Sequence, residues 1–394
     1  MSYYRDEFRL KPDLIYLNHA AVSPWPQRTV DAVSRFAVEN GTLGSSNYPD
    51  WVETETRLRE RLSRLIGVGT TDDIALLKNT SEGLSLIAHG LAWKSGENVV
   101  TSDQEFPSNS IVWESLSRYG VLTKKAALNS AKSPEDALFE AVDRNTRLIS
   151  ISSVEFGTGL RMDLERIGAF CKKRGILFCV DAIQSLGAIR MDGSAIQADF
   201  IVADGHKWMM APEGCALFYS SPEARDRLQL QQYGWHMREV LYDFNTDSDA
   251  LSNCEKPGCC SEIPDWTTAK SARRFEPGSP NMLGIHGLEA SLSLIEEIGM
   301  EQIEKLVLEH SRFLVDAVQA HPKLELITPV DPARHGGIIT FSIKGNSLED
   351  MHNKLTNKGI QCAVRSGGIR FSPHFYTTAE QLEVAIKVLQ KTIS

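Results

Sequence analysis

The chain has 394 residues, of which 42% are hydrophobic and 24% are charged, and its formal net charge at pH 7 is −9. This composition is typical of a globular protein of two or three domains, and an acidic balance without a Lys/Arg cluster argues against nucleic acid as a partner. The sequence contains no long uncharged apolar run and no export or transit signal at its start, so we expect no membrane partner and a cytoplasmic location.

Short apolar runs alternate with segments of helical period through the middle of the chain. The predicted buried strands cover residues 98–102, 147–154, 176–181, 199–203 and 215–220. Helical spacing between them is clearest at residues 111–119 and 164–174. This alternation predicts an α/β fold with a mostly parallel sheet and helices on both of its faces.

The pattern changes after about residue 284. The next predicted elements are helices at 285–298 and 301–320, strands in the segments LELIT, GIITFSI and IQCAV, and a helix within 377–390. These elements predict a smaller α+β domain. We therefore expect a large domain over residues 17–284, packed against a small domain made of residues 1–16 and 285–394.

Two polar residues at the ends of neighbouring strands indicate a site. Asp181 ends the predicted strand ILFCVD, and ligands of open parallel sheets bind beyond the carboxyl ends of strands. A carboxylate there could pair with the protonated nitrogen of a pyridoxal ring, and Gln184 could donate to the phenolic oxygen of that ring. Lys207 follows the next strand among apolar residues and glycines, which favours a lowered pKa and Schiff-base chemistry. Taken alone, Asp181 is explained equally well as the N-cap of a helix.

Anion sites are indicated at two further places. In the segment LLKNTSEGLSLIAHG, Thr80 and Ser81 stand where a helix begins, and free amides, hydroxyls and the helix dipole favour a phosphate there. An ordinary N-cap explains the same residues equally well. Arg365 and Arg370 carry guanidinium groups suited to a substrate carboxylate, although one of them could be a surface charge.

Seven motifs in order along the chain resemble those of a known family. The motifs are YLNHAA, NTSEG, EFPSN, VDAIQS, DGHKW, RFEPGSPN and GGIRFSPHFYTTAEQLE. They resemble the class V aminotransferase superfamily of fold-type I enzymes, and within it the branch of cysteine desulfurases, selenocysteine lyases and isopenicillin N epimerase. The resemblance implies a large domain with a mostly parallel seven-stranded sheet, pyridoxal 5′-phosphate as cofactor, a small amino acid as substrate and a homodimer.

The resemblance also implies a role for individual residues. Lys207 would be the catalytic lysine that forms the internal aldimine, and no metal is implied. The other implied roles are Asp181 at the ring nitrogen, Gln184 at the ring oxygen, Thr80, Ser81 and His206 at the phosphate, Phe106 over the ring, Ser279 at the phosphate of the partner subunit, and Arg370 at the substrate carboxylate. Asn18, His19, Asn109 and the segment YGWHMRE are candidates for contact with the substrate side chain.

The sequence departs from the desulfurase pattern at several positions. Phe106 stands where many desulfurases place a His over the ring, and Phe cannot transfer protons. Val154 or Glu155 falls where desulfurases supply an Asn to the ring oxygen. Asp204 replaces a Ser beside the phosphate, and because a carboxylate would be repelled there, we expect Asp204 to point elsewhere or to bind through another group.

The cysteines bear on the choice of reaction. The segment VRSGGIRFSP joins Arg365 almost directly to Arg370, which leaves no room for the mobile loop that carries the nucleophilic Cys of desulfurases. Cys362, before this junction, is predicted to be a core residue. The seven cysteines have no paired spacing, which favours reduced thiols. Cys254, Cys259 and Cys260 are most simply loop residues, with a metal site or a redox trap as alternatives.

These observations favour chemistry that Lys207 can perform alone. We predict an enzyme that forms an external aldimine, removes the α-proton through Lys207 and eliminates the β-substituent of a sulfur-containing amino acid, as a C-S lyase does. A class V aminotransferase or an isopenicillin N epimerase-like racemase is the first alternative, and a true cysteine desulfurase the second. A ligand-binding protein without activity would be expected to have lost Lys207 or Asp181. A nicotinamide enzyme is disfavoured because no complete GxGxxG motif is present.

Overall fold

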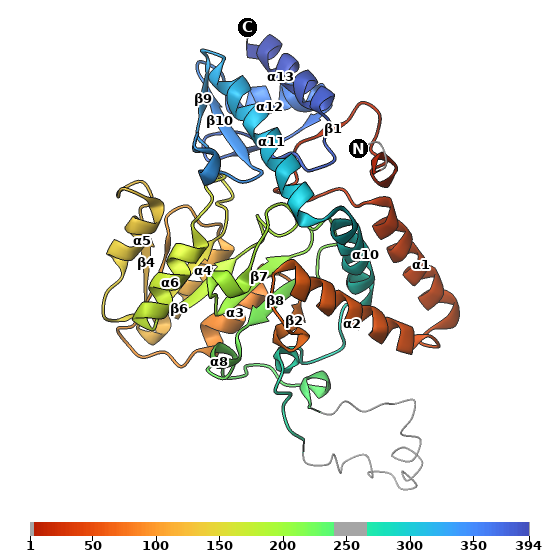
Figure 1. Cartoon of the computed structure of the whole chain (residues 1–394), viewed down its shortest axis with the longest axis vertical. Helices are drawn as coiled ribbons and strands as arrows, with labels where there is room; N and C mark the ends of the chain where they lie inside the picture. The colour runs from red at the N-terminus through yellow and green to blue at the C-terminus, as the bar shows by residue number, and fades with distance from the viewer. Residues whose placement is uncertain (1–3, 240–265, 394) are drawn as a thin grey trace.

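The computed structural model describes residues 4–239 and 266–393. A seven-stranded sheet lies at its centre between layers of helices, and a smaller sheet with three helices lies at one end (Figure 1). In spatial order, the strands of the large sheet are β2 (Ile74–Leu77), β8 (Ala216–Ser220), β7 (Phe200–Asp204), β6 (Leu177–Asp181), β5 (Thr146–Ser152), β3 (Asn98–Ser102) and β4 (Leu122–Ala126).

The large sheet is mostly parallel, as predicted. β8 runs antiparallel to both of its neighbours, and every other pair in the sheet is parallel. Because β7 and β8 are antiparallel neighbours, the loop between them (residues 205–215) lies at the carboxyl end of β7. Asp181 ends β6 at the same edge of the sheet. The topology therefore brings Lys207, which lies in that loop, toward Asp181.

Both faces of the large sheet are buried. In β6, Leu177 and Cys179 pack in one apolar cluster while Phe178 and Val180 pack in the other. Strands buried on both sides read as continuous apolar runs, which is why their positions are evident from the sequence. The helices that cover the two faces or flank the sheet are α1 (Gln27–Leu43), α2 (Tyr48–Leu65), α3 (Thr80–Gly90), α4 (Ser108–Glu114), α5 (Pro134–Ala141), α6 (Leu164–Arg174), α7 (Gly193–Ile196), α8 (Pro222–Arg225) and α10 (Met282–Ile298).

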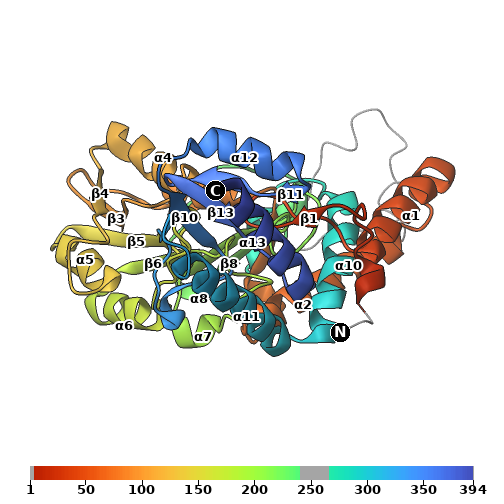
Figure 2. The ribbon, with the colours of Figure 1, turned by 90° about the horizontal axis from the view of Figure 1, so that it is seen from above.

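The C-terminal part builds the second, antiparallel sheet. Its elements are strands β12 (Ala363–Arg365), β13 (Gly368–Phe371), β10 (Ile339–Ile343) and β9 (Leu324–Leu326), with helices α11 (Met300–Gln319), α12 (Leu348–Asn357) and α13 (Ala379–Ile393). β1 (Ile15–Tyr16) pairs with β11 (Ile360–Gln361), so the start of the chain joins this part. Figure 2 looks down on it and shows α12, β13 and α13 lying over the rest of the molecule. The segment IQCAV forms two strands instead of one, because β11 and β12 pair with different partners.

The boundary between the two domains remains a prediction. Helix α10 packs on α1 and α2, and Leu288, Ile303 and Val307 share an apolar cluster with the large sheet. Further along α11, Leu314, Val315 and Val318 join the cluster around the small sheet. We therefore propose a C-terminal boundary within α11 in place of the predicted one at residue 284. Within the described ranges, no helix combines the length and the apolar character that a membrane crossing requires.

Candidate active site

A cavity of about 340 Å³ lies at the carboxyl edge of β6 and β7. Loops from both domains line it. Most of the predicted site residues are on its wall, namely Thr80, Ser81, Phe106, Asp181, Gln184, His206, Lys207 and Arg370. Its other lining residues are Ala20, Ala21, Val22, Asn79, Ser108, Phe156, Ile183, Asp204 and Arg365. The tertiary structure thus gathers residues that are far apart in the sequence.

Lys207 and Asp181 are two buried ionisable residues on the wall of this cavity. Lys207 is 8% exposed, and burial lowers the pKa of its amine to about 8, although the charge of Asp181 opposes this shift. Burial raises the pKa of Asp181 to about 6, opposed by the amide of Ile183, which donates to Oδ1 at 3.1 Å, and by Lys207. A lowered pKa leaves about a tenth of the amine neutral at pH 7, and the neutral amine is the nucleophile.

The amide of Gln184 is held in one orientation. Its Oε1 accepts a hydrogen bond from Nε1 of Trp208 at 3.0 Å, and its Nε2 donates to the carbonyl of Ala20 at 3.1 Å. An amide nitrogen carries two N–H groups, so one remains for a ligand in the cavity. This geometry is suited to a donor for a phenolic oxygen.

The start of α3 forms one end of the cavity. Asn79 caps the helix by accepting from the amide of Glu82 at 2.9 Å, and the first-turn amides of a helix have no partner within it. A Cβ at Gly83 would lie 2.6 Å from Cγ1 of Val202, so only Gly lets α3 pack this closely on β7. The hydroxyls of Thr80 and Ser81 line the same end. Amides, hydroxyls and the helix dipole together fit a phosphate group.

Asp204 lies beside this end of the cavity. Its Oδ2 is 3.1 Å from Nδ1 of His206, and its backbone amide donates to Oγ1 of Thr80 at 3.2 Å. The imidazole therefore stands next to the carboxylate that replaces a Ser of desulfurases. The carboxylate of Asp204 thus faces the imidazole of His206 at the end of the cavity that fits a phosphate.

Two arginines form the opposite end. Arg370 is 1% exposed, and its guanidinium donates to the carbonyl of Phe156 at 2.8 Å and approaches Oδ1 of Asn18 at 3.5 Å. Burial, and then the charge of Arg365, lower the pKa of Arg370 to about 10. In the described part of the chain neither arginine forms an ion pair. A buried guanidinium without an acid is suited to an anionic ligand.

The turn between β12 and β13 brings these arginines together. Arg365 pairs in register with Gly368, and the two residues between them, Ser366 and Gly367, have φ angles of 47° and 77°. Two consecutive left-handed residues make the tight turn typical of two-residue hairpins. Phe106 forms part of the wall, with its ring 5.1 Å from that of Phe156 and 5.4 Å from Nζ of Lys207.

A sequence comparison identifies the family. The sequence profile described as aminotransferase class-V matches residues 15–384. The chain belongs to this family. Class V enzymes use pyridoxal phosphate and act on amino acids, so the predictions of the family, of an enzyme and of the cofactor are confirmed.

Similar proteins match over nearly the full length. A probable cysteine desulfurase of Methanothermobacter thermautotrophicus is 27% identical, covering 98% of this chain and 96% of that protein. The solved apo structure of the cysteine desulfurase of Thermococcus onnurineus NA1 is similar with a TM-score of 0.86 at 22% identity, covering 100% and 98% of the two chains. The cystine C-S lyase C-DES, solved with its reaction product cysteine persulfide, has a TM-score of 0.83 at 21% identity, covering 96% and 97%. The chain is thus a cysteine desulfurase-like class V enzyme.

Three predicted site residues are not on the wall of the class V cavity. Asn18 is behind Arg370. His19 is fully buried, with Nδ1 2.8 Å from the carbonyl of Ser372 and Nε2 2.7 Å from the hydroxyl of Tyr376. Ser279 lines a separate cavity of about 350 Å³. The role of His19 at the substrate stays a prediction, and its two hydrogen bonds favour a structural role.

The remaining candidates are placed as follows. Asn109 accepts hydrogen bonds from Trp113 at 2.8 Å and from Ser150 at 2.6 Å, away from the cavity wall. Cys362 is buried, as predicted for a core residue. Cys254, Cys259 and Cys260 lie outside the described residues.

The sequence analysis missed the lining residues Ala20, Ala21, Val22, Ser108, Phe156 and Ile183. The rule that ligands bind beyond strand ends could have indicated Phe156, which follows β5.

His236, from the segment YGWHMRE, belongs to a buried group elsewhere. Its ligand atoms and those of Glu55 and Glu276 lie within 4.8 Å of one another, close enough to hold a metal. However, the guanidinium of Arg59 contacts Glu55 at 2.5 Å and Glu276 at 2.7 Å. A side-chain cation therefore already neutralises these carboxylates.

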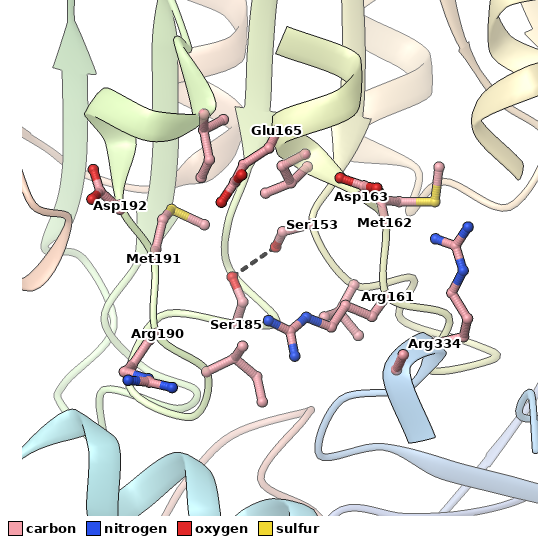
Figure 3. Close-up of a pocket in the computed structure, with 15 residues that line it drawn as sticks. Ser153, Arg161, Met162, Asp163, Glu165, Ser185, Arg190, Met191, Asp192 and Arg334 are labelled. Carbon is pink, nitrogen blue, oxygen red and sulfur yellow. Dashed lines mark hydrogen bonds between the residues drawn. The ribbon is translucent and has the colours of Figure 1, made fainter. Parts of the chain in front are cut away.

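A larger cavity, of about 530 Å³, lies beside the turn that contains Ser185 (Figure 3). Three arginines reach its rim, but each approaches an acid: Arg161 and Arg190 contact Glu304, and Arg334 contacts Glu135. Among the described residues, its lining includes no lysine, cysteine or histidine. It therefore offers no amine for imine chemistry, and the smaller cavity, which contains Lys207, is the candidate active site.

Proposed function

We propose that this class V enzyme is a C-S lyase that eliminates the β-substituent of a sulfur-containing amino acid. The observation that carries the proposal is the chemistry of the cavity wall. Lys207 offers a buried amine with a lowered pKa beside Asp181, and no described cysteine lines the cavity. A proton-transferring amine without a thiolate supports elimination rather than persulfide formation.

The proposed roles follow from the positions of the side chains. Bound pyridoxal phosphate supplies the electron sink that stabilises negative charge at the α-carbon of the substrate. When the cofactor is bound, Asp181 would hold the ring nitrogen in its protonated form, Gln184 would donate to the ring oxygen, and Phe106 would lie against the ring. Thr80, Ser81 and His206 would bind the phosphate.

The substrate end of the cavity completes the proposal. Arg370 binds the α-carboxylate and is oriented by Asn18 and by the carbonyl of Phe156. Lys207 removes the α-proton, the sulfur substituent leaves the β-carbon with the bonding electron pair, and addition of water releases pyruvate and ammonia.

The described cysteines support the absence of a persulfide step. Burial raises the pKa of Cys362 to about 12, and it also raises the pKa of Cys171, Cys179 and Cys215. Such groups remain thiols at neutral pH, whereas attack on a substrate sulfur requires a thiolate. The tight hairpin between Arg365 and Gly368 further supports this reading, because it contains no cysteine.

The products distinguish the proposed reaction from its alternatives. Purified holoenzyme should be incubated with cysteine, cystine and cysteine sulfoxides while pyruvate, ammonia and sulfide are measured. A lyase releases pyruvate and ammonia in equal amounts. Alanine with persulfide sulfur would instead identify a desulfurase, inversion at the α-carbon an epimerase, and amino transfer to a keto acid a transaminase. Absence of pyruvate from every substrate would exclude the lyase.

The two arginines predict a preference among substrates. Replacing Arg370 with Gln is expected to raise KM for every amino-acid substrate by about 10- to 100-fold, because a charged hydrogen bond to the α-carboxylate is lost. Arg365→Gln should raise KM for cystine, which carries a second carboxylate, about tenfold more than KM for cysteine. KM measured with both substrates tests this, and equal effects of Arg365→Gln on the two would contradict it.

We also propose a homodimer in which Ser279 binds the phosphate of the partner subunit. Ser279 lies outside the cavity of its own chain, which supports a role in another subunit. Several large side chains are exposed in the described surface, including Trp25 at 37% and Val38 at 66%. Sedimentation should give about twice the chain mass of 43.8 kDa, and a monomer that is active would refute the proposal.

A further inference from the structure

Two Glu–Phe pairs occupy equivalent places at the ends of neighbouring strands. Glu105 and Phe106 follow β3, and Glu155 and Phe156 follow β5. The two phenyl rings meet edge to face, 5.1 Å apart, on the wall of the cavity. The two glutamates are not on that wall. Glu155 is 0% exposed, and Glu105 is half-buried.

Each glutamate accepts hydrogen bonds from the last residue of the strand that precedes the other glutamate. Glu155, after β5, accepts a hydrogen bond at 2.8 Å from the hydroxyl of Ser102, the last residue of β3. Glu105, after β3, accepts at 2.7 Å from the amide and at 2.6 Å from the hydroxyl of Ser152, the last residue of β5. Ser152 is in register with Asp181 on β6. This reciprocal arrangement links the ends of β3 and β5, next to the end of β6 that carries Asp181.

Nothing basic neutralises these two acids in the described part of the chain. Neither glutamate forms an ion pair there, and Oε2 of Glu155 has no hydrogen-bond partner although it is fully buried. The titratable groups that act on Glu155 are Glu105, Asp181 and Asp103, all of them acids. An ionised carboxylate in such a place would be desolvated, repelled and unsatisfied.

We propose that Glu105 and Glu155 form a carboxyl pair that retains a proton at neutral pH and acts as a positioning pair for the cofactor site. The protonated pair joins β3 to β5 and holds Phe106 and Phe156 in place on the cavity wall. It does so without placing a second negative charge beside Asp181. This proposal rests on the proposed function only through the role of Asp181. The protonation of the pair can be measured in the cofactor-free protein.

The expected pH dependence follows from burial. Burial is the largest cause of the raised pKa of both glutamates, to about 8 for Glu105 and well above its ordinary value for Glu155. The native state therefore binds these protons more tightly than the unfolded chain does. The contribution of the pair to stability is complete below about pH 4.5 and is lost as the pH rises through about 8. Other groups titrate as well, so a difference between matched variants is needed.

The test compares thermal unfolding of the cofactor-free full chain with that of Glu155→Gln, which imitates the neutral acid. The two melting temperatures should be similar at pH 5, and by pH 8.5 the variant should melt about 3 °C or more above the unmodified protein. Glu140→Gln, at an exposed position on α5, is the matched control and should show the same difference at every pH. The holoenzyme should follow the same order, which tests the pair in the loaded site.

Two results would overturn the proposal. In the first, the stability difference between Glu155→Gln and the unmodified protein does not change with pH. In the second, Glu155→Gln is less stable than the unmodified protein at pH 8.5. Either outcome means that Glu155 is ionised. If Glu155→Gln does not fold, Glu105→Gln takes its place with the same expected pH profile. Failure of both variants to fold at pH 6 would also contradict the proposal. The melting curves do not depend on lyase activity. The proposed function can therefore be refuted while the carboxyl pair stands, and the pair can be refuted while the proposed function stands.

Discussion

Replacing Lys207 with Ala is expected to prevent covalent attachment of pyridoxal phosphate and to lower turnover by at least about 10³-fold. The reason is that Lys207 is the single lysine on the cavity wall in the described part of the chain, and its buried amine has a pKa of about 8. Such an amine is both the nucleophile toward an aldehyde and the base for the α-proton.

The measurement is direct. Borohydride should fix the cofactor to a peptide containing Lys207 in the unmodified protein, and mass spectrometry should find no such adduct in Lys207→Ala. Lys94→Ala, at an exposed position, serves as the control and should behave as the unmodified protein. Turnover of Lys207→Ala within tenfold of the unmodified enzyme would mean that another group removes the proton.

Replacing Asp181 with Asn is expected to lower turnover by about 10²-fold while the cofactor stays attached to Lys207. Asp181 is 2% exposed, and its carboxylate is the proposed partner of the ring nitrogen of the cofactor. A neutral amide of the same shape cannot hold that nitrogen protonated, so the electron sink weakens. Because Asp181 raises the pKa of Lys207, its loss should make the amine more neutral and leave attachment intact.

The visible spectrum and the turnover number together check this expectation. Asp13→Asn, at an exposed position, is a suitable control because it removes one carboxylate elsewhere. Full turnover by Asp181→Asn would show that the ring nitrogen needs no carboxylate. Loss of the attached cofactor would instead assign Asp181 to binding rather than to chemistry.

The large sheet could be predicted from the sequence where its strands are buried on both faces. β5, β6, β7 and β8 are such strands, and their apolar runs are continuous. β4 was missed because it lies at the edge of the sheet and carries polar residues, with the sequence LTKKA. The reversal of β8 was also missed. The direction of a strand depends on its connection and its neighbours rather than on its own composition.

In the candidate site, too, some residues could be predicted from the sequence and others could not. Asp181 and Lys207 could be predicted because each follows a buried strand, and parallel strands end at one edge of a sheet. Phe156 lies in a turn outside the recognised motifs, and Ser108, although part of the motif EFPSN, begins α4. Whether these side chains reach the cavity depends on tertiary packing. The pairing of Glu105 with Glu155 could not be predicted either, because it depends on which strands are neighbours.

The sequence by itself determined the α/β class and the family resemblance, and it predicted the residues that would hold and activate pyridoxal phosphate. Those properties are local, since they depend on periodicity, on strand ends and on motifs of a few residues. Only the tertiary structure decided that Arg365 and Arg370 share one cavity with Lys207, that His19 is hydrogen-bonded away from the cavity wall, and that Glu155 is buried without a counter-charge. These properties depend on distances between segments far apart in the chain, and burial then sets the pKa of each group.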